Sequence, residues 1–162
     1  MRETEFERLY AEHAQPLLAF LVYRTGDRAL AEDLVSDTFE RVLTSRRGFD
    51  RRRASEKTWL YSIALNLVRD RVRRVQAGHR ALDRAYAGNV EQRDHDPFDA
   101  VDERDALQQA LGRLSVQERE TVALRYGADL TVPEIARLTG TKRTTIEGRL
   151  YRSLRKLRSE LE

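Results

Sequence analysis

The stretch from Thr131 to Arg152, TVPEIARLTGTKRTTIEGRLYR, has the spacing of a helix-turn-helix. It opens with Thr-Val-Pro-Glu, a capping-box pattern with proline in the first turn, where a missing N–H costs nothing. Ala136 is small where two helices would cross, and Gly140 can take the positive φ that a tight turn requires. Ile146, six residues further on, is spaced to anchor the second helix on the first. The stretch therefore predicts two short helices that cross at a turn.

Polar and basic residues gather at the start of the second of these helices, in a pattern that suits the DNA major groove. Arginine can read guanine there, a carboxylate can accept from cytosine, and small residues allow close approach. The residues expected to face DNA are Lys142, Arg143, Thr144, Thr145, Glu147, Gly148 and Arg149, with Arg152 on the same outer face. The alternative is a plain antiparallel helix pair without a nucleic-acid role.

The rest of the chain also has helical periodicity, with apolar residues three and four apart. Pro16 is expected to break or kink the first helix, since proline lacks the N–H and clashes with the preceding turn. Asp27, Ser55 and Ser115 are expected to cap the helices that follow them. Helices are predicted over about 3–23, 28–45, 56–75, 99–113, 116–126, 132–139 and 142–162. The residues expected on their inner faces include Leu43 of the second helix and Ile146, Leu150, Leu154, Leu157 and Leu161 of the last.

Between the third and fourth helices, residues 76–97 lose this periodicity, and such a length is too great for a routine loop inside one compact domain. The predicted fold is therefore all-α, with two small helical domains joined by a flexible linker. The predicted boundaries are 1–76 for the N-terminal domain, 77–97 for the linker and 98–162 for the C-terminal domain that contains the helix-turn-helix.

The composition of the 162 residues excludes several classes of function. The chain has no cysteine, which excludes disulfide scaffolds, cysteine-ligated metals and thiol nucleophiles. Its three histidines are far apart, so a zinc site is not expected. No stretch approaches 18 apolar residues, and the N-terminus is polar and acidic, so we expect a soluble, intracellular protein. No catalytic constellation, metal site or cofactor site is recognisable, and no enzymatic activity is predicted.

The formal net charge of +3 hides an alternation of acidic and basic blocks. Residues 1–40, 41–80, 81–120 and 121–162 carry net charges of −5, +9, −5 and +4. Arginine supplies 27 of the 30 basic residues, and its planar guanidinium suits bidentate contacts to phosphates and bases. The alternative is an ordinary solvated surface from an arginine-rich proteome.

The most basic block combines arginines with aromatic and amide side chains. Arg51, Arg52 and Arg53 lie in the loop before the third helix, and that helix brings Trp59, Tyr61 and Asn66. This combination favours single-stranded DNA, whose bases stack on aromatic rings and offer their edges to hydrogen bonds. Trp59 also fits the apolar stripe of its helix, which favours a core position, and an exposed helical asparagine is common.

Four blocks, in this order, make the whole chain resemble the extracytoplasmic-function (ECF) group of bacterial RNA polymerase sigma factors. The blocks are AEDLVSDTF at 31–39, TWLYSIALNLVRDRVRR at 58–74, LSVQERE at 114–120, and LTVPEIA at 130–136 with TIEGRL at 145–150. The resemblance implies an alternative sigma factor that binds core polymerase, recognises −35 and −10 promoter elements and promotes DNA melting. The competing hypothesis is a stand-alone two-domain helix-turn-helix regulator.

The resemblance also implies roles for individual residues. The exposed residues of the second helix would dock on the clamp of the largest polymerase subunit, and Asn66 would hold a flipped base of the melted −10 element. The polymerase-binding set is Asp33, Asp37, Glu40 and Arg41. The −10 set is Arg51, Arg52, Arg53, Lys57, Asn66, Arg69, Arg71, Arg73 and Arg74. The residues of 142–152 listed above would read the −35 element.

The implied partners are core polymerase, through its clamp and β flap, and promoter DNA, both duplex and melted. An anti-sigma factor is a further partner common in the family, and no membrane contact is expected. The implied location is the cytoplasm, with nucleoid association in the holoenzyme. The sequence departs from the family where Thr141 and Lys142 replace an apolar residue and a capping serine, and where Glu147 and Gly148 replace a basic residue and a serine.

Overall fold

The computed structural model describes residues 2–85 and 103–162, and every regular element in these ranges is helical. The described parts are called the N-terminal half (2–85) and the C-terminal half (103–162). The N-terminal half contains α1 (Glu3–Thr25), α2 (Arg28–Ser45), the 3₁₀ turn η1 (Arg46–Gly48) and α3 (Glu56–Ala85). The C-terminal half contains α4 (Glu103–Gly112), α5 (Val116–Val122), the π-helical turn η2 (Ala123–Gly127), α6 (Val132–Thr139) and α7 (Arg143–Leu161).

The expected caps and turns are confirmed at the helix ends. The side chains of Asp27, Ser55 and Ser115 accept hydrogen bonds of 3.1 Å from the backbone N–H three residues later. Gly26 ends α1 in the left-handed region, at φ 70°. These contacts involve neighbouring residues only, which is why the local sequence predicts them.

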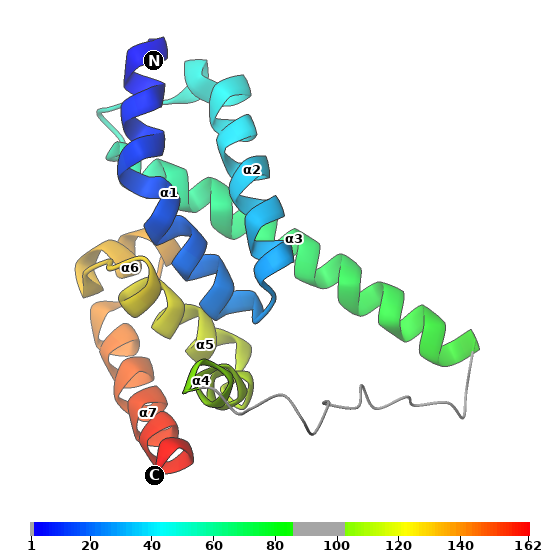
Figure 1. Ribbon diagram of the computed structural model, residues 1–162. Coiled ribbons are helices and arrows are strands. Elements are labelled where there is room, and N and C mark those ends of the chain that lie inside the picture. The colour runs from blue at the N-terminus through cyan, green and yellow to red at the C-terminus, as the bar shows by residue number, and fades with distance from the viewer. Residues whose placement is uncertain (1, 86–102) are drawn as a thin grey trace.

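The first helix continues through Pro16 to Thr25, so the expected break does not occur. Figure 1 shows α1 bending near its middle, as a proline inside a helix would cause. Below the bend, Leu17, Phe20 and Leu21 are fully buried. The predicted kink is therefore present, and Leu9 on the other side of it is fully buried as well.

The N-terminal half is a three-helix bundle in which α2 packs on both α1 and α3. Figure 1 shows the C-terminal part of α3 projecting away from this bundle. The predicted end of that helix near Val75 is wrong, because α3 runs to Ala85 and includes part of the expected linker. Residues 73–82 are exposed, so helix-forming residues rather than an apolar face account for the extension. The expected start of the fourth helix at residue 99 and the remainder of the linker, 86–97, lie outside the described residues.

The C-terminal half packs α4, α5 and α6 around α7. Ile146, Leu150 and Leu157 face inward from α7 as predicted. Leu154 and Leu161, expected inside, are 41% and 50% exposed, and Leu43 of α2 is 42% exposed. These three were wrongly assigned to the core, because an apolar stripe can be wider than the surface that covers it. In the ranges that the structure describes, none of the helices combines the length and the hydrophobicity that a membrane span requires.

Candidate nucleic-acid interface

The helix-turn-helix is formed by α6 and α7 as its sequence predicts. The Oγ1 atom of Thr131 accepts a hydrogen bond of 3.3 Å from the N–H of Glu134, and the Glu134 carboxylate accepts one of 3.0 Å from the N–H of Thr131. Burial would raise the pKa of Glu134, but these bonds and nearby Lys57 lower it below its ordinary value. Gly140 makes the turn at φ 64°, and Ile146 is fully buried against the preceding helix.

The residues expected to read the −35 element lie along the N-terminal part of α7. Lys142 is the N-cap residue of α7, and its side chain makes no capping bond. The exposed members are Lys142, Arg143, Thr144, Thr145, Glu147 and Arg152, whereas Gly148 and Arg149 are half-buried. None of their charged side chains forms an ion pair with another part of 2–85 or 103–162. The guanidinium and ammonium groups of this set are therefore available to phosphates or base edges.

Gly148 is covered by another member of the same set. A Cβ atom added at Gly148 would lie 3.2 Å from Nη1 of Arg152, one helical turn later. Gly148 does not adopt a positive φ, so the backbone does not require glycine. The glycine therefore leaves space that the Arg152 side chain partly occupies.

The expected −10 set lies mainly on α3 and on the loop that precedes it. Asn66 and Arg69 are exposed on α3 and line a cleft of about 590 Å³, together with Arg73 of α3 and Glu120 of α5. Arg74 is exposed further along α3. The structure thus brings the amide of Asn66 and the four guanidinium groups of Arg69, Arg71, Arg73 and Arg74 onto one helix.

Most basic residues of this set already have acidic partners within the chain. Arg51 pairs with Glu5 at 3.1 Å, Arg53 with Asp50 at 3.8 Å, Lys57 with Glu134 at 3.8 Å, Arg71 with Asp37 at 3.2 Å, and Arg73 with Asp70. Arg69 forms the shortest bidentate contact, with Glu120. DNA phosphates would have to replace these carboxylates, since the same N–H groups cannot satisfy both.

The aromatic residues of α3 differ from the expected stacking surface. Tyr61 is fully buried against Phe20, with ring centroids 5.8 Å apart, so its expected place on the basic surface is wrong. Burial raises the pKa of Tyr61, whose hydroxyl has no hydrogen-bond partner among the described residues. Trp59 is half-buried and packs on Phe49 at 4.9 Å, which supports the core alternative for its ring. The helical spacing of apolar residues along α3 does not distinguish a buried ring from an exposed one, because burial depends on which residues of other helices pack on the ring.

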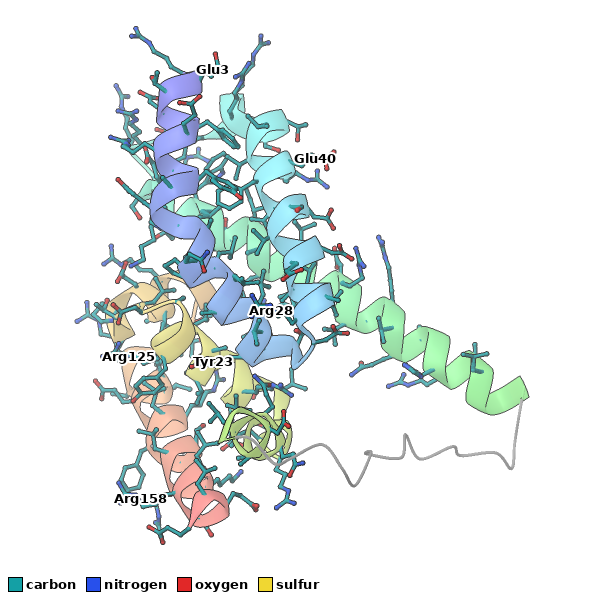
Figure 2. The ribbon with its side chains drawn as sticks, viewed as in Figure 1. Glu3, Tyr23, Arg28, Glu40, Arg125 and Arg158 are labelled. Carbon is teal, nitrogen blue, oxygen red and sulfur yellow. The ribbon has the colours of Figure 1, made fainter. Side chains whose placement is uncertain are left out.

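The expected polymerase-binding set lies on the outer side of α2. Asp33, Glu40 and Arg41 are exposed and Asp37 is half-buried. Figure 2 shows Glu40 pointing away from α1. A shallow groove of about 270 Å³ runs between Asp37, Glu40 and Arg41 and reaches Leu67 of α3. The set is therefore contiguous and accessible.

Three polar residues at the contact between the two halves were not predicted. Glu120 is only 8% exposed, and Arg24 of α1 is 6% exposed with its Nε 3.6 Å from a Glu120 oxygen. The Nε of Arg119 donates a hydrogen bond of 2.7 Å to the backbone oxygen of Tyr23. Their partners are 51 to 96 residues away, so no local pattern in the sequence marks them.

These features define an all-α protein with two basic, helix-borne surfaces suited to nucleic acid. Two family models match its two halves: Sigma-70 region 2 over residues 9–78 and Sigma-70 region 4 over residues 104–157. The chain belongs to the ECF RNA polymerase sigma factors. The resemblance seen in the sequence is thus confirmed.

Several ECF RNA polymerase sigma factors are similar over nearly the whole chain. BldN of Streptomyces coelicolor is 34% identical over 154 residues, which cover 94% of this chain and 58% of BldN. SigL of Mycobacterium tuberculosis is 29% identical over 154 residues, which cover 95% of this chain and 87% of SigL. SigX of Bacillus subtilis is 29% identical over 168 residues, which cover all of this chain and 86% of SigX.

Two solved structures share the fold. The sigma factor RpoE of Bartonella quintana, in complex with the anti-sigma factor NepR, superimposes with a TM-score of 0.78 at 23% identity. The match covers 98% of this chain and 97% of RpoE. CnrH, in complex with the cytosolic domain of CnrY, gives a TM-score of 0.68 at 24% identity, covering 99% of this chain and 89% of CnrH. The all-α architecture expected from the sequence is therefore confirmed.

Proposed function

We propose that this chain is an alternative sigma factor that binds core RNA polymerase, recognises −35 and −10 promoter elements and promotes melting of the DNA. The observation that carries the proposal is the match of region 2 to the half that bears the α3 arginines and of region 4 to the half that bears the helix-turn-helix. The chain acts as a specificity subunit without catalytic activity of its own. It works in the cytoplasm and is associated with the nucleoid while in the holoenzyme.

Each surface has a separate task in this proposal. The N-terminal part of α7 enters the major groove of the −35 element. Its cations, which form no ion pair among the described residues, supply phosphate and base contacts. The α3 surface holds the −10 element, with Asn66 taking one base out of the stack and the neighbouring arginines holding the backbone. The exposed carboxylates of α2 dock on the polymerase clamp, and the C-terminal half meets the β flap.

An anti-sigma factor is included among the proposed partners. The RpoE structure that shares this fold contains the anti-sigma factor NepR. A stand-alone helix-turn-helix regulator is the weaker candidate, because the region 2 match assigns the N-terminal half to a sigma-factor region rather than to a dimerisation or sensing domain.

The test is run-off transcription with core polymerase on promoters selected by the reconstituted holoenzyme. We expect specific initiation that depends on the chain, and loss of most of it with Arg143→Ala. The matched control is Arg158→Ala, an exposed arginine at the opposite end of the same helix (Figure 2). Absence of core binding together with tight duplex binding by the free chain would instead support the stand-alone regulator.

A further inference from the structure

The last part of α3 stands apart from the three-helix bundle. Figure 1 shows it projecting from the bundle, and every residue over 73–82 is exposed. Packing therefore contributes little to this part, and short helices without packing are only marginally stable in water. The region 2 match ends at residue 78 and the region 4 match begins at residue 104, so His79 and the residues after it on α3 lie outside both.

This exposed part of α3 carries an excess of positive charge. Residues 71–82, whose side chains the structure describes, include four arginines and no carboxylate. Three of these arginines belong to the expected −10 set, whereas Arg80 does not. A basic helix surface is commonly only solvated, so the face of the helix on which Arg80 lies determines whether it can share a ligand with the −10 set.

Arg80 lies on the same face of α3 as the central residues of the −10 set. Four exposed residues follow one another at intervals of three, four and seven positions, and such intervals return a helical side chain to one face. This row consists of Asn66, Arg69, Arg73 and Arg80. The first three line one cleft. The row therefore begins in the expected −10 surface and continues beyond its cleft to Arg80.

The length of the row limits how far along DNA it can reach. From Asn66 to Arg80 the helix advances about 21 Å, at about 1.5 Å per residue. Duplex DNA rises about 3.4 Å per base pair, so the row spans at most about six base pairs. If Asn66 holds a base of the −10 element, Arg80 reaches the DNA upstream of that element, on the side of the −35 element.

We propose that the exposed end of α3 is a further DNA-binding surface, in which Arg80 binds backbone phosphates of the duplex between the −10 and −35 elements. This inference rests on the proposed function, because it takes Asn66 as a −10 contact. Residues 73–82 contain no phenylalanine, tyrosine or tryptophan on which unstacked bases could lie, which favours duplex over single-stranded DNA. A guanidinium at a phosphate reads no base, so the contact adds affinity without sequence preference.

The first experiment measures binding of the holoenzyme to two promoter fragments that both lack the −35 element. One fragment keeps about twelve base pairs of duplex upstream of the −10 element, twice the reach of the row, and the other ends at the upstream edge of that element. Arg80→Gln should weaken binding to the longer fragment about three- to tenfold, the range for one charge-assisted contact, and leave binding to the shorter one unchanged. Arg80→Lys should restore most of the affinity, because an ammonium group also binds phosphate. Arg158→Gln, at an exposed arginine of α7, is the control.

The second experiment uses Gly78 to test the helix that carries Arg80. Gly78 lies between Arg73 and Arg80, does not adopt a positive φ, and an added Cβ there meets no atom within 4 Å. Gly78→Pro should interrupt α3 and move Arg80 out of the row, so it should weaken binding to the longer fragment as Arg80→Gln does. Gly78→Ala is the matched control and should bind at least as tightly as the unaltered chain, because alanine favours a helix.

The salt dependence of binding tests whether phosphate is the ligand. On the longer fragment, Arg80→Gln should reduce the slope of log affinity against log salt concentration by about one, the value for one lost phosphate contact. The reduction should be the same when the base sequence between the two elements is changed. Titration of Arg80→Gln with core polymerase in the absence of DNA tests the other kind of partner. Weaker binding of core polymerase by this variant would show that Arg80 contacts protein and would overturn the proposal.

Two results with the promoter fragments would also overturn the proposal. One is equal affinity of Arg80→Gln and the unaltered chain for the longer fragment, and the other is a loss of equal size on both fragments. Circular dichroism checks that each variant is folded. Either result, obtained while the unaltered chain directs run-off transcription from the full promoter, leaves the proposed function standing. Failure of the unaltered chain to bind core polymerase and to direct transcription would contradict the proposed function itself.

Discussion

The Nη2 atom of Arg71 on α3 donates a hydrogen bond of 3.2 Å to Oδ2 of Asp37 on α2. The resemblance to ECF sigma factors implies polymerase docking for Asp37 and contact with the −10 backbone for Arg71, so this bond joins two surfaces proposed to bind different partners. A substitution at Asp37 therefore alters both. Asp33, which is exposed and forms no ion pair among the described residues, is the better position for testing docking alone.

Reversing the charge of Asp33 should weaken docking on polymerase. We expect Asp33→Lys to reduce affinity for core polymerase about tenfold, the effect of losing one close charge pair at an interface. Binding of −35 duplex DNA should be unchanged, because Asp33 lies on α2, in the other half of the chain. Titration of labelled chain with core polymerase measures the effect. The control is Glu7→Lys, which makes the same charge change at an exposed position of α1. Equal affinities of the two variants for core polymerase would contradict the docking assignment.

Removing the Asn66 amide should slow promoter opening. We expect Asn66→Ala to reduce the opening rate on duplex promoter about three- to tenfold, the cost of one or two hydrogen bonds to a base. On a pre-melted bubble that lacks this base, holoenzyme containing the variant should react at the same rate as the unaltered holoenzyme. Stopped-flow fluorescence from a base analogue at −10 gives both rates. Gln76→Ala removes another amide from the same cleft and serves as the control; an unchanged opening rate in Asn66→Ala would remove this residue from the site.

Filling the space at Gly148 should stabilise the C-terminal half. Gly148→Ala should raise the free energy of unfolding by up to about 1 kcal/mol, since alanine favours a helix interior and no positive φ is required. The gain should be larger in an Arg152→Ala background, because Nη1 of Arg152 is the atom that the new methyl group meets at 3.2 Å. Urea denaturation of the two single variants and the double variant measures this coupling. A loss of stability in both backgrounds would show that glycine is needed for another reason.

The stability of the N-terminal half should depend on pH through His13. Burial lowers the pKa of His13 below its ordinary value of 6.5, and Lys57 adds to this effect, whereas Glu12 and Glu56 oppose it. The unfolded chain therefore binds this proton more readily than the folded chain does. The contribution of neutral His13 to the free energy of unfolding is therefore complete above about pH 6.5 and is lost as the pH falls below that value.

His13→Gln should reduce the loss of unfolding free energy between about pH 7.5 and pH 5.5, measured by urea denaturation. His79→Gln, which removes an exposed imidazole from α3, is the matched control. The same slope in His13→Gln and in the unaltered chain would show that other groups cause the pH dependence.

Features set by neighbouring residues could be predicted from the sequence. The caps at Asp27, Ser55, Ser115 and Thr131 and the turn at Gly140 follow from short patterns. The all-α fold and the family follow from periodicity and from blocks in a fixed order. The roles of the individual site residues and the domain boundaries remain predictions.

Features set by distant residues could not be predicted in the same way. Helical spacing placed Leu154 in the core, but whether a stripe is covered depends on which helix packs over it. The residues around Gly127 in the sequence give no sign that this glycine lies against the backbone of Phe20. The acidic partners of Arg69 and Arg71 are separated from them by 51 and 34 residues, so only the folded chain reveals that these arginines are occupied.

The bidentate pair between Arg69 and Glu120 has a thermodynamic consequence. If one guanidinium serves either a carboxylate of the same chain or a phosphate, the Arg69–Glu120 contact and DNA binding at Arg69 are linked, and the linkage is reciprocal. Every factor by which this contact weakens DNA affinity is then the factor by which DNA weakens the contact. DNA bound at Arg69 would thus loosen the contact between α3 and α5, and its dissociation would let the contact form again.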